Sequence, residues 1–279
     1  MKKRLFFALP LLALGIALAS YPFVSNWQYQ QRTDKVIAAY STAMESKDAA
    51  SLQAELEAAR CYNEELASSE VALTDPFEAT TVQGESDYNS LLNLDSSGLM
   101  SYVEIPKIDV YLPVYHGTGS AVLEQGVGHL EGTSLPIGGQ NTRAVLTGHS
   151  GLNSAKLFTD LSELKKGDLF FLHTLQQTLA YRVSRIEVVL PTEANLSIVE
   201  GKDLCTLITC TPLGINTHRL MVTGERTEYT EDLHTTALEE PEAPSQWMQE
   251  YRQALCVSLL LSAIITVVTI IIRRRVRRG

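Results

Sequence analysis

Three side chains that could share one reaction stand at or near the ends of predicted strands. Cys210 closes the apolar run Leu207-Ile208-Thr209, His149 lies between two glycines in Thr147-Gly148-His149-Ser150-Gly151, and Arg219 begins the next apolar run. A thiolate can attack a carbonyl carbon, an imidazolium can protonate a leaving amine, and a guanidinium can donate to the oxyanion. If the strands that carry Cys210 and Arg219 are neighbours, both side chains converge, and the set predicts nucleophilic acyl transfer.

Each of these residues also has a simpler explanation when it is taken alone. Cysteine often serves as a small buried hydrophobe, and an arginine is often just ion-paired at the surface. Cys205 lies five residues before Cys210 on the same predicted strand, so it should point to the opposite face and belong to the core. His129 and His218 are weaker candidates for the base.

Short apolar runs separated by Gly and Pro predict the strands that must position these residues. Several short strands of this kind favour an all-β barrel or sandwich. Short helical stretches are expected near Ala121–Gln125 and Ser154–Leu164. The predicted strands are Tyr102–Ile105, Ile108–Tyr115, Arg143–Leu146, Asp168–Leu172, Leu179–Leu190, Leu204–Thr209 and Arg219–Val222.

The region before the strands is predicted to be helical from 27 to 70, with a polar break at Ser46-Lys47-Asp48. The apolar stripe has helical spacing and should pack on the main domain or form a stalk. Its members are Val36, Ala39, Tyr40, Ala43 and Met44 before the break and Leu52, Leu56, Ala59 and Tyr62 after it. Residues 73–98 are rich in Thr, Ser, Asn, Gly and Asp, which is typical of an exposed linker or lid.

The charge distribution indicates a membrane. The chain of 279 residues has a net charge of −9. Eight cations lie at its two ends, so the remainder carries 15 Lys and Arg against 32 Asp and Glu, a net charge of −17. Such an acidic body excludes the basic footprint of a nucleic-acid-binding protein.

Both basic ends border apolar runs. Lys2, Lys3 and Arg4 precede an uncharged stretch that is typical of a signal peptide or an uncleaved signal anchor. The run from Leu255 to Ile272 carries no charge and is followed by five arginines, which predicts a transmembrane helix with a cytoplasmic tail. The alternative is a C-terminal core helix with a basic tail. Residues 26–252 are then expected outside the cell, and the acidic segment before the span reads as a juxtamembrane linker.

The four cysteines, Cys61, Cys205, Cys210 and Cys256, show neither a CxxC motif nor a Cys/His metal spacing. Zinc is therefore not expected, and no cofactor is predicted. Unpatterned cysteines in an exported domain also argue against a disulfide framework, so one of them can be a reactive thiol.

The segments Leu146-Thr147-Gly148-His149, Thr206-Leu207-Ile208-Thr209-Cys210 and His218-Arg219-Leu220 resemble the signature motifs of sortases, the membrane-bound cysteine transpeptidases of Gram-positive bacteria. The order along the chain also fits, with His149 far upstream of Cys210 and Arg219 shortly after it. Asp75-Pro76-Phe77 resembles the lid motif of the class C, pilus-assembling sortases, with Phe where many members have Trp. The expected C-terminal transmembrane helix is also typical of that class.

The resemblance implies a mainly β fold, a closed eight-stranded sortase-type β-barrel with short helices. The expected parts are a signal peptide or anchor (1–25), a helical region (26–72), a lid loop (73–98), the catalytic barrel (99–227), an acidic juxtamembrane linker (228–253), a transmembrane helix (254–272) and a basic cytoplasmic tail (273–279). The catalytic residues would be Cys210, His149 and Arg219. The lid would place the Phe77 ring over the Cys210 sulfur and the Asp75 carboxylate against Arg219, while Pro76 stiffens the turn.

The implied reaction is cleavage of a Leu-Pro-x-Thr-Gly-like sorting signal between Thr and Gly through a thioacyl intermediate on Cys210. A lysine amine of the next pilin subunit would resolve the intermediate, so pilin subunits and the membrane are the expected partners. Two alternatives remain at this point. One is a housekeeping sortase that anchors proteins to the cell wall, and the other is a noncatalytic membrane scaffold that binds sorting peptides.

Overall fold

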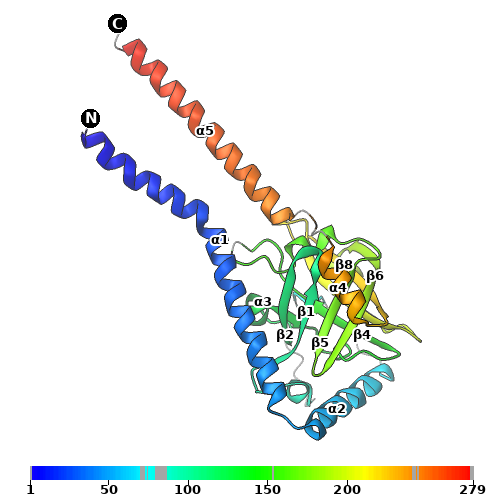
Figure 1. Ribbon diagram of the computed structural model, residues 1–279. Helices are drawn as coiled ribbons and strands as arrows, with labels where there is room; N and C mark the ends of the chain where they lie inside the picture. Colours follow the sequence, from blue (N-terminus) through cyan, green and yellow to red (C-terminus); the bar gives the residue numbers. More distant parts are fainter. Residues whose placement is uncertain are drawn as a thin grey trace.

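The computed structural model describes residues 2–69, 73, 75–78, 87–152, 154–240, 243 and 245–276. Within these residues the strands form a closed eight-stranded barrel, which confirms the fold that the resemblance implied (Figure 1). The order of the strands around the barrel is β1-β2-β3-β4-β7-β8-β6-β5. The strands are β1 (Leu99–Ile105), β2 (Val110–His116), β3 (Val127–His129), β4 (Thr142–Thr147), β5 (Leu169–Thr174), β6 (Gln177–Val189), β7 (Asp203–Thr211) and β8 (His218–Thr227).

The barrel encloses the main hydrophobic core. Alternate residues of each strand point inward, because successive side chains of a strand face opposite sides of the sheet. Val103, Leu146, Phe170, Leu207 and Val222 lie in this core and are inaccessible to solvent. Most neighbouring strands are antiparallel, but β2 with β3 and β4 with β7 are parallel. The parallel pair β4 and β7 matters for the site, since both strands end at the same edge.

Strand β3 was not predicted from the sequence. It has three residues, Val127, Gly128 and His129, which is too short to show an alternating pattern. A Cβ built on Gly128 would lie 2.3 Å from the carbonyl oxygen of Gly117, so only glycine lets the two backbones approach this closely. A glycine in this position reads as a turn in the sequence, and the strand was missed for that reason.

Helices α1 (Lys2–Glu45) and α2 (Ala49–Ala67) confirm the predicted helical region and its break. The Asp48 side chain accepts from the Ser51 backbone N–H at 2.6 Å and begins α2. On α2 the predicted residues Leu52, Leu56 and Ala59 are buried against the barrel.

The predicted stripe on α1 is partly wrong. Ile37 and Tyr40 are buried and Ala39 is exposed, so the buried face is rotated relative to the prediction. The Tyr40 hydroxyl sets this rotation, because it donates to the Met100 carbonyl of β1 at 3.1 Å and accepts from the Leu175 backbone N–H at 2.9 Å. Helix α1 is also continuous through residue 25, where the sequence placed a boundary.

The two short helical predictions inside the barrel region have different outcomes. Helix α3 (Ser120–Gln125) confirms the first. In the second predicted stretch, Ser154–Leu164, only the 3-10 helix η3 (Thr159–Glu163) forms. Leu157 has a φ of 41°, and a positive φ is incompatible with a right-handed helix through that residue. The remaining 3-10 helices are η1 (Asp87–Ser90), η2 (Pro106–Ile108) and η4 (Pro191–Glu193).

The acidic segment predicted as a linker at 228–253 contains a helix. Helix α4 (Glu231–Glu239) begins at Thr230, whose side chain accepts from the Leu233 N–H at 3.1 Å. Its first turn holds Glu231 and Asp232, and negative charge is favourable at a helix N-terminus. The acidic composition that suggested a solvated linker therefore stabilises a helix here.

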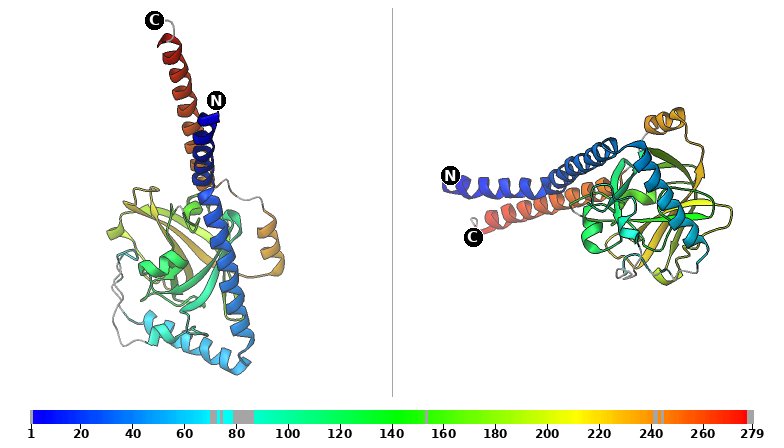
Figure 2. Two further views of the ribbon diagram at one scale, coloured as in Figure 1. Left: turned by 90° about the vertical axis from the view of Figure 1, so that its left-hand side faces the viewer. Right: turned by 90° about the horizontal axis from the view of Figure 1, so that it is seen from below.

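Helix α5 (Gln246–Val276) and the first half of α1 project from the barrel on the same side (Figures 1 and 2). They meet near the barrel, where Tyr251 donates to the Ala19 carbonyl and its ring packs edge-on against Phe23 with centroids 4.7 Å apart. Among the described residues, no helix combines the length and hydropathy needed to cross a membrane.

Candidate active site

Cys210 and Arg219 are directly opposite each other on neighbouring strands. Strands β7 and β8 are antiparallel, and their register pairs Cys210 with Arg219. Side chains of directly paired residues stand on the same face of a sheet, about 5 Å apart at Cβ. The convergence that the sequence made conditional on this pairing is therefore present.

His149 joins them from the parallel strand β4. The Gly148 N–H donates to the Ile208 carbonyl at 3.0 Å, and the Ser150 hydroxyl donates to the Cys210 carbonyl at 2.8 Å. These bonds extend the β4–β7 register past the end of β4, so His149 lies beside Cys210. The imidazole, the thiol and the guanidinium thus come from three adjacent strand ends.

The two glycines beside His149 have different roles. A Cβ at Gly148 would lie 2.7 Å from the Phe158 ring, which is completely buried, so a larger residue would push His149 away from β7. Gly151 has a φ of 74°, a conformation that glycine adopts without strain, and it turns the chain away from the site.

Asp75 forms a bidentate ion pair with Arg219. Nε of Arg219 donates to one carboxylate oxygen at 2.9 Å and Nη2 donates to the other at 2.5 Å. Nη1 donates to the carbonyls of Asn216 and His218 at 3.0 and 3.2 Å. Both side chains of the pair are nearly inaccessible to solvent. In this arrangement the guanidinium is occupied by protein acceptors.

Phe77 lies close to both the imidazole and the guanidinium. Its ring centroid is 5.8 Å from that of His149, and the Arg219 Cζ lies 4.9 Å from the centroid over the ring face. The sequence expectation placed the ring over the Cys210 sulfur, and that contact stays a prediction; the observed contacts of the ring are with His149 and Arg219. The ring also packs against an apolar cluster beside the site, formed by Leu130, Val145, Leu196, Ile208 and Met221. Residues 74 and 79–86 of the predicted lid loop lie outside the described residues.

The surroundings favour the uncharged forms of the thiol and the imidazole. Burial raises the pKa of Cys210, and the nearby Asp75 carboxylate adds to this while Arg219 opposes it. Burial also lowers the pKa of His149, which Glu124 opposes only in part. Hydrogen bonding to Asp75 raises the pKa of Arg219. With Asp75 and Phe77 in place, a thiolate–imidazolium pair is therefore disfavoured.

The other candidates are placed elsewhere. Cys205 is completely buried in the barrel core, as predicted, and burial raises the pKa of its thiol well above the ordinary value. His129 is also fully buried, and its two ring nitrogens lie 2.9 Å from the Tyr88 hydroxyl and 2.8 Å from the Ser134 carbonyl. Burial lowers the pKa of His129 to about 4, so it is a neutral structural residue. His218 is paired with Thr211, one position beyond the Cys210–Arg219 pair.

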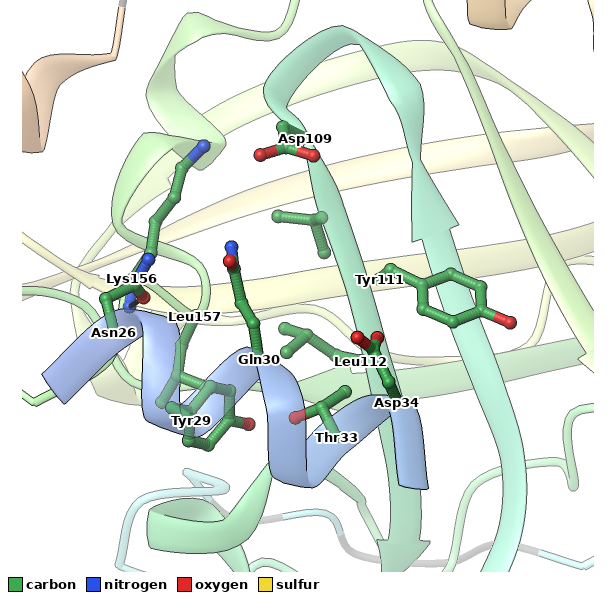
Figure 3. Close-up of a pocket in the computed structure, with 11 residues that line it drawn as sticks. Asn26, Tyr29, Gln30, Thr33, Asp34, Asp109, Tyr111, Leu112, Lys156 and Leu157 are labelled. Atoms are coloured by element: carbon green, nitrogen blue, oxygen red, sulfur yellow. Dashed lines mark hydrogen bonds between the residues drawn. The ribbon is translucent and has the colours of Figure 1, made fainter. Parts of the chain in front are cut away.

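The structure has a further cavity of about 240 Å³ between α1 and β2 (Figure 3). Asn26, Gln30 and Asp34 of α1 face Asp109 and Lys156 across it. Cys210, His149 and Arg219 do not line this cavity, so it is separate from the candidate site.

Residues 103–227 match the family model of the sortase domain. The crystal structure of sortase C from Streptococcus pneumoniae is 42% identical in sequence, with a TM-score of 0.64, and the alignment covers 70% of this chain and 98% of that one. The chain belongs to the sortase family. Its members are cysteine transpeptidases, which agrees with the chemistry expected of a thiol, an imidazole and a guanidinium at one strand edge.

Two further sortase C structures are similar over most of their length. Sortase C-1 from Actinomyces oris is 47% identical, with a TM-score of 0.61, over 64% of this chain and 99% of that one. Sortase C1 from Streptococcus agalactiae is 40% identical, with a TM-score of 0.65, over 71% and 97%. Among curated sortases, sortase A from Bacillus anthracis is 29% identical over 48% of this chain, which spans 62% of that protein's length.

Proposed function

We propose that the chain is a pilin-polymerising transpeptidase. It cleaves a Leu-Pro-x-Thr-Gly-like sorting signal between Thr and Gly and joins the Thr carbonyl to a lysine amine of the next pilin subunit. The observation that carries the proposal is the Cys210–Arg219 pairing with His149 alongside, closed by Asp75. The assignment of the chain to the pilin-polymerising class is supported by its similarity to sortase C structures. The substrates of the pneumococcal sortase C are pilins.

The residues divide the chemistry as follows. The Cys210 thiol passes its proton to His149 as its sulfur attacks the Thr carbonyl carbon, and the carbonyl oxygen gains negative charge that Arg219 is placed to stabilise. His149 gives a proton to the Gly nitrogen as the C–N bond breaks, which leaves a thioester on Cys210. A lysine amine then attacks the thioester, loses a proton to His149 and releases the thiolate, so the product is an isopeptide bond.

The decisive experiment combines the purified full chain with a pilin that carries the sorting signal and an accessible lysine. Covalent pilin ladders are expected, together with a thioacyl adduct whose mass maps to Cys210. Transfer to a cell-wall peptide amine without ladders would indicate the housekeeping alternative. The absence of any thioacyl adduct would indicate a sorting-peptide-binding scaffold and would refute the catalytic proposal.

We further propose that Asp75, Pro76 and Phe77 act as a lid that closes the site. The ion pair with Asp75 occupies the donors that the oxyanion needs, and the Phe77 ring packs near both His149 and Arg219. Substrate entry then requires the segment to move, and a substrate that binds the open form shifts the population toward it.

Faster modification of Cys210 is expected when the lid is weakened. In Phe77→Ala and Asp75→Asn the closed form loses its ring contacts or its ion pair, so a thiol reagent should label Cys210 about 10-fold faster if closure is weakened by about 1.4 kcal/mol. The labelling time course is followed by mass spectrometry of the Cys210 peptide. Glu78→Gln, a change of the exposed neighbouring carboxylate, is the matched control. If both lid variants label at the parent's rate, residues 75–77 do not cover Cys210.

The pH dependence of labelling should move in a defined direction. A thiol labels through its thiolate, so a raised pKa places the rise in rate at higher pH. Asp75→Asn removes a carboxylate that raises the pKa of Cys210 and leaves Arg219, which lowers it. The midpoint of the rate–pH profile is therefore expected at lower pH in Asp75→Asn than in the parent. A midpoint that stays in place or moves upward would contradict the assigned electrostatics.

The cellular location is a separate proposal that rests on the sequence alone. The uncharged run 255–272 with arginines behind it supports a membrane anchor, with the barrel outside and the C-terminus in the cytoplasm. Fractionation with protease treatment of intact cells tests it. The anchored topology predicts a membrane-bound chain whose barrel is cut from outside; recovery in the soluble fraction would refute it.

A further inference from the structure

Outside the Cys210 site, three side chains from three elements converge on one point. Glu104 comes from β1, His173 from β5 and His234 from α4. The Nε2 atoms of both histidines lie close to the same carboxylate oxygen, Oε2 of Glu104, at 2.9 and 3.0 Å. All three potential ligand atoms lie within 4.8 Å of one another. We propose that Glu104, His173 and His234 form a binding site for a divalent transition-metal ion, with Zn²⁺ as the preferred ion.

The ligand set selects the ion. Two imidazole nitrogens and one carboxylate oxygen are a typical three-ligand set for Zn²⁺, whereas Mg²⁺ and Ca²⁺ prefer sites made of oxygen alone. Bonds of about 2.0–2.1 Å in a tetrahedron hold the ligand atoms about 3.3 Å apart. The two separations from Glu104 Oε2, 2.9 and 3.0 Å, differ from this by only a few tenths of an ångström, and the two histidine nitrogens lie within 4.8 Å of each other, so side-chain rotations would admit the ion.

The second ring nitrogen of each histidine already has a suitable partner. Nδ1 of His173 lies 3.2 Å from the Thr178 hydroxyl, and Nδ1 of His234 lies 3.5 Å from the Tyr229 hydroxyl. A metal-ligating histidine usually donates its other N–H to such an outer partner, which fixes the tautomer that turns Nε2 toward the metal. Tyr229 donates its own proton to Glu231 at 3.2 Å, so its oxygen is left to accept.

Aromatic packing holds both rings in place. The Tyr102 ring stacks on His173 with centroids 4.4 Å apart and planes 10° from parallel, and Phe171 packs against His234 at 4.6 Å. The side chains of His173 and His234 are only 13% and 18% exposed. A preformed pair of this kind loses little side-chain freedom on binding, which favours affinity.

The carboxylate side of the cluster is open enough for a fourth ligand. Glu104 lines a surface cavity of about 450 Å³ together with Tyr111, Leu238 and Glu240. A water molecule entering from this cavity can complete a tetrahedral shell. The site therefore has the three protein ligands and the access that a zinc ion with one exchangeable position requires.

Metal binding would fasten α4 to the barrel. The apolar contact of α4 is small: Ala237 and Leu233, with Tyr229 just before the helix, pack against Phe171 and Ala180. Helix α4 lies at the side of the barrel and precedes α5 (Figure 2). An ion shared by β1, β5 and α4 would therefore cross-link α4 to the barrel. The site would thus fix where α5 leaves the barrel, without taking part in transpeptidation.

Zinc titration of the purified full chain tests the proposal. All proteins carry Cys210→Ala, because Cys210 and His149 could otherwise bind zinc together. After treatment with a chelator and equilibrium dialysis, one tightly bound Zn²⁺ per chain is expected, with a rise in the thermal unfolding temperature that Mg²⁺ does not produce. Glu104→Gln and His234→Ala should lose this ion and the rise. Glu239→Gln, an exposed carboxylate at the other end of the same helix, should keep both.

Thr178→Val provides a variant that keeps all three ligands. Loss of its hydrogen bond to His173 should weaken zinc binding about 10–100-fold, the usual effect of removing an outer partner. This readout remains informative if a ligand variant fails to fold. The proposal is overturned if the parent binds no zinc at saturation, or if Glu104→Gln, His234→Ala and Thr178→Val all bind zinc with the parent's stoichiometry and affinity.

Discussion

Replacement of Cys210 by alanine is expected to abolish thioacyl formation and transpeptidation while the barrel stays folded. Cys210 is the proposed nucleophile at the strand edge, and loss of a nucleophile removes the covalent route altogether, a decrease on the order of 10⁴–10⁶-fold in turnover. The side chain lies at the end of β7 and is only half-buried, so the change leaves no large cavity in the core. Mass spectrometry of the acyl adduct and thermal unfolding measure the two effects separately.

Cys205→Ala is the matched control on the same strand. Its sulfur is enclosed in the barrel core, so this variant should keep transpeptidation and lose about 1 kcal/mol of unfolding free energy because a small cavity forms. The opposite pattern, with an active Cys210→Ala and an inactive Cys205→Ala, would reassign the nucleophile. The two thiols lie five residues apart and therefore on opposite faces of one strand, so the two variants test different sides of β7.

The parts of the site that are close in the sequence were the parts that could be predicted. Cys210 and Arg219 lie on consecutive strands, so a single hairpin register brings them together. His149 is a different case, because its position depends on the parallel pairing of β4 with β7, two strands that are far apart in the sequence. Residue chemistry alone left His129 and His218 as alternatives. The family motif favoured His149, and the burial of His129 gives the physical reason against that rival.

What the sequence could not reveal depends on contacts between distant elements. Glu104, His173 and His234 come from three separate elements, so no ligand spacing marks them, and the sequence predicted no metal site. Helix α4 was hidden by its acidic composition, which is also typical of a solvated linker. The burial of Ile37 and exposure of Ala39 on α1 follow from the hydrogen bonds of Tyr40, a tertiary contact that helical periodicity does not contain.

Arg219→Lys is expected to lower turnover about 10²–10³-fold, the usual effect of losing one oxyanion donor. Arginine presents a rigid planar fork, and three of its nitrogens are used here: Nε and Nη2 toward Asp75, and Nη1 toward two carbonyls. Lysine offers a single ammonium group, which cannot hold the same orientation. Turnover on a short sorting peptide measures the loss, and Arg185→Lys, an exposed arginine on β6, is the control that should keep the parent's rate.

The same variant should also label faster at Cys210, because a lysine cannot reproduce the bidentate pair with Asp75 that holds the proposed lid closed. Turnover and labelling of Cys210 would then move in opposite directions. A general loss of structure would do the same but would also expose Cys205, which is completely buried in the folded chain, so Cys205 is expected to stay unlabelled in this variant. If turnover falls while labelling stays at the parent's rate, Arg219 serves the reaction but does not hold the lid. If turnover is unchanged, Arg219 has no part in the chemistry. Its role would then be limited to the ion pair with Asp75 in the closed form.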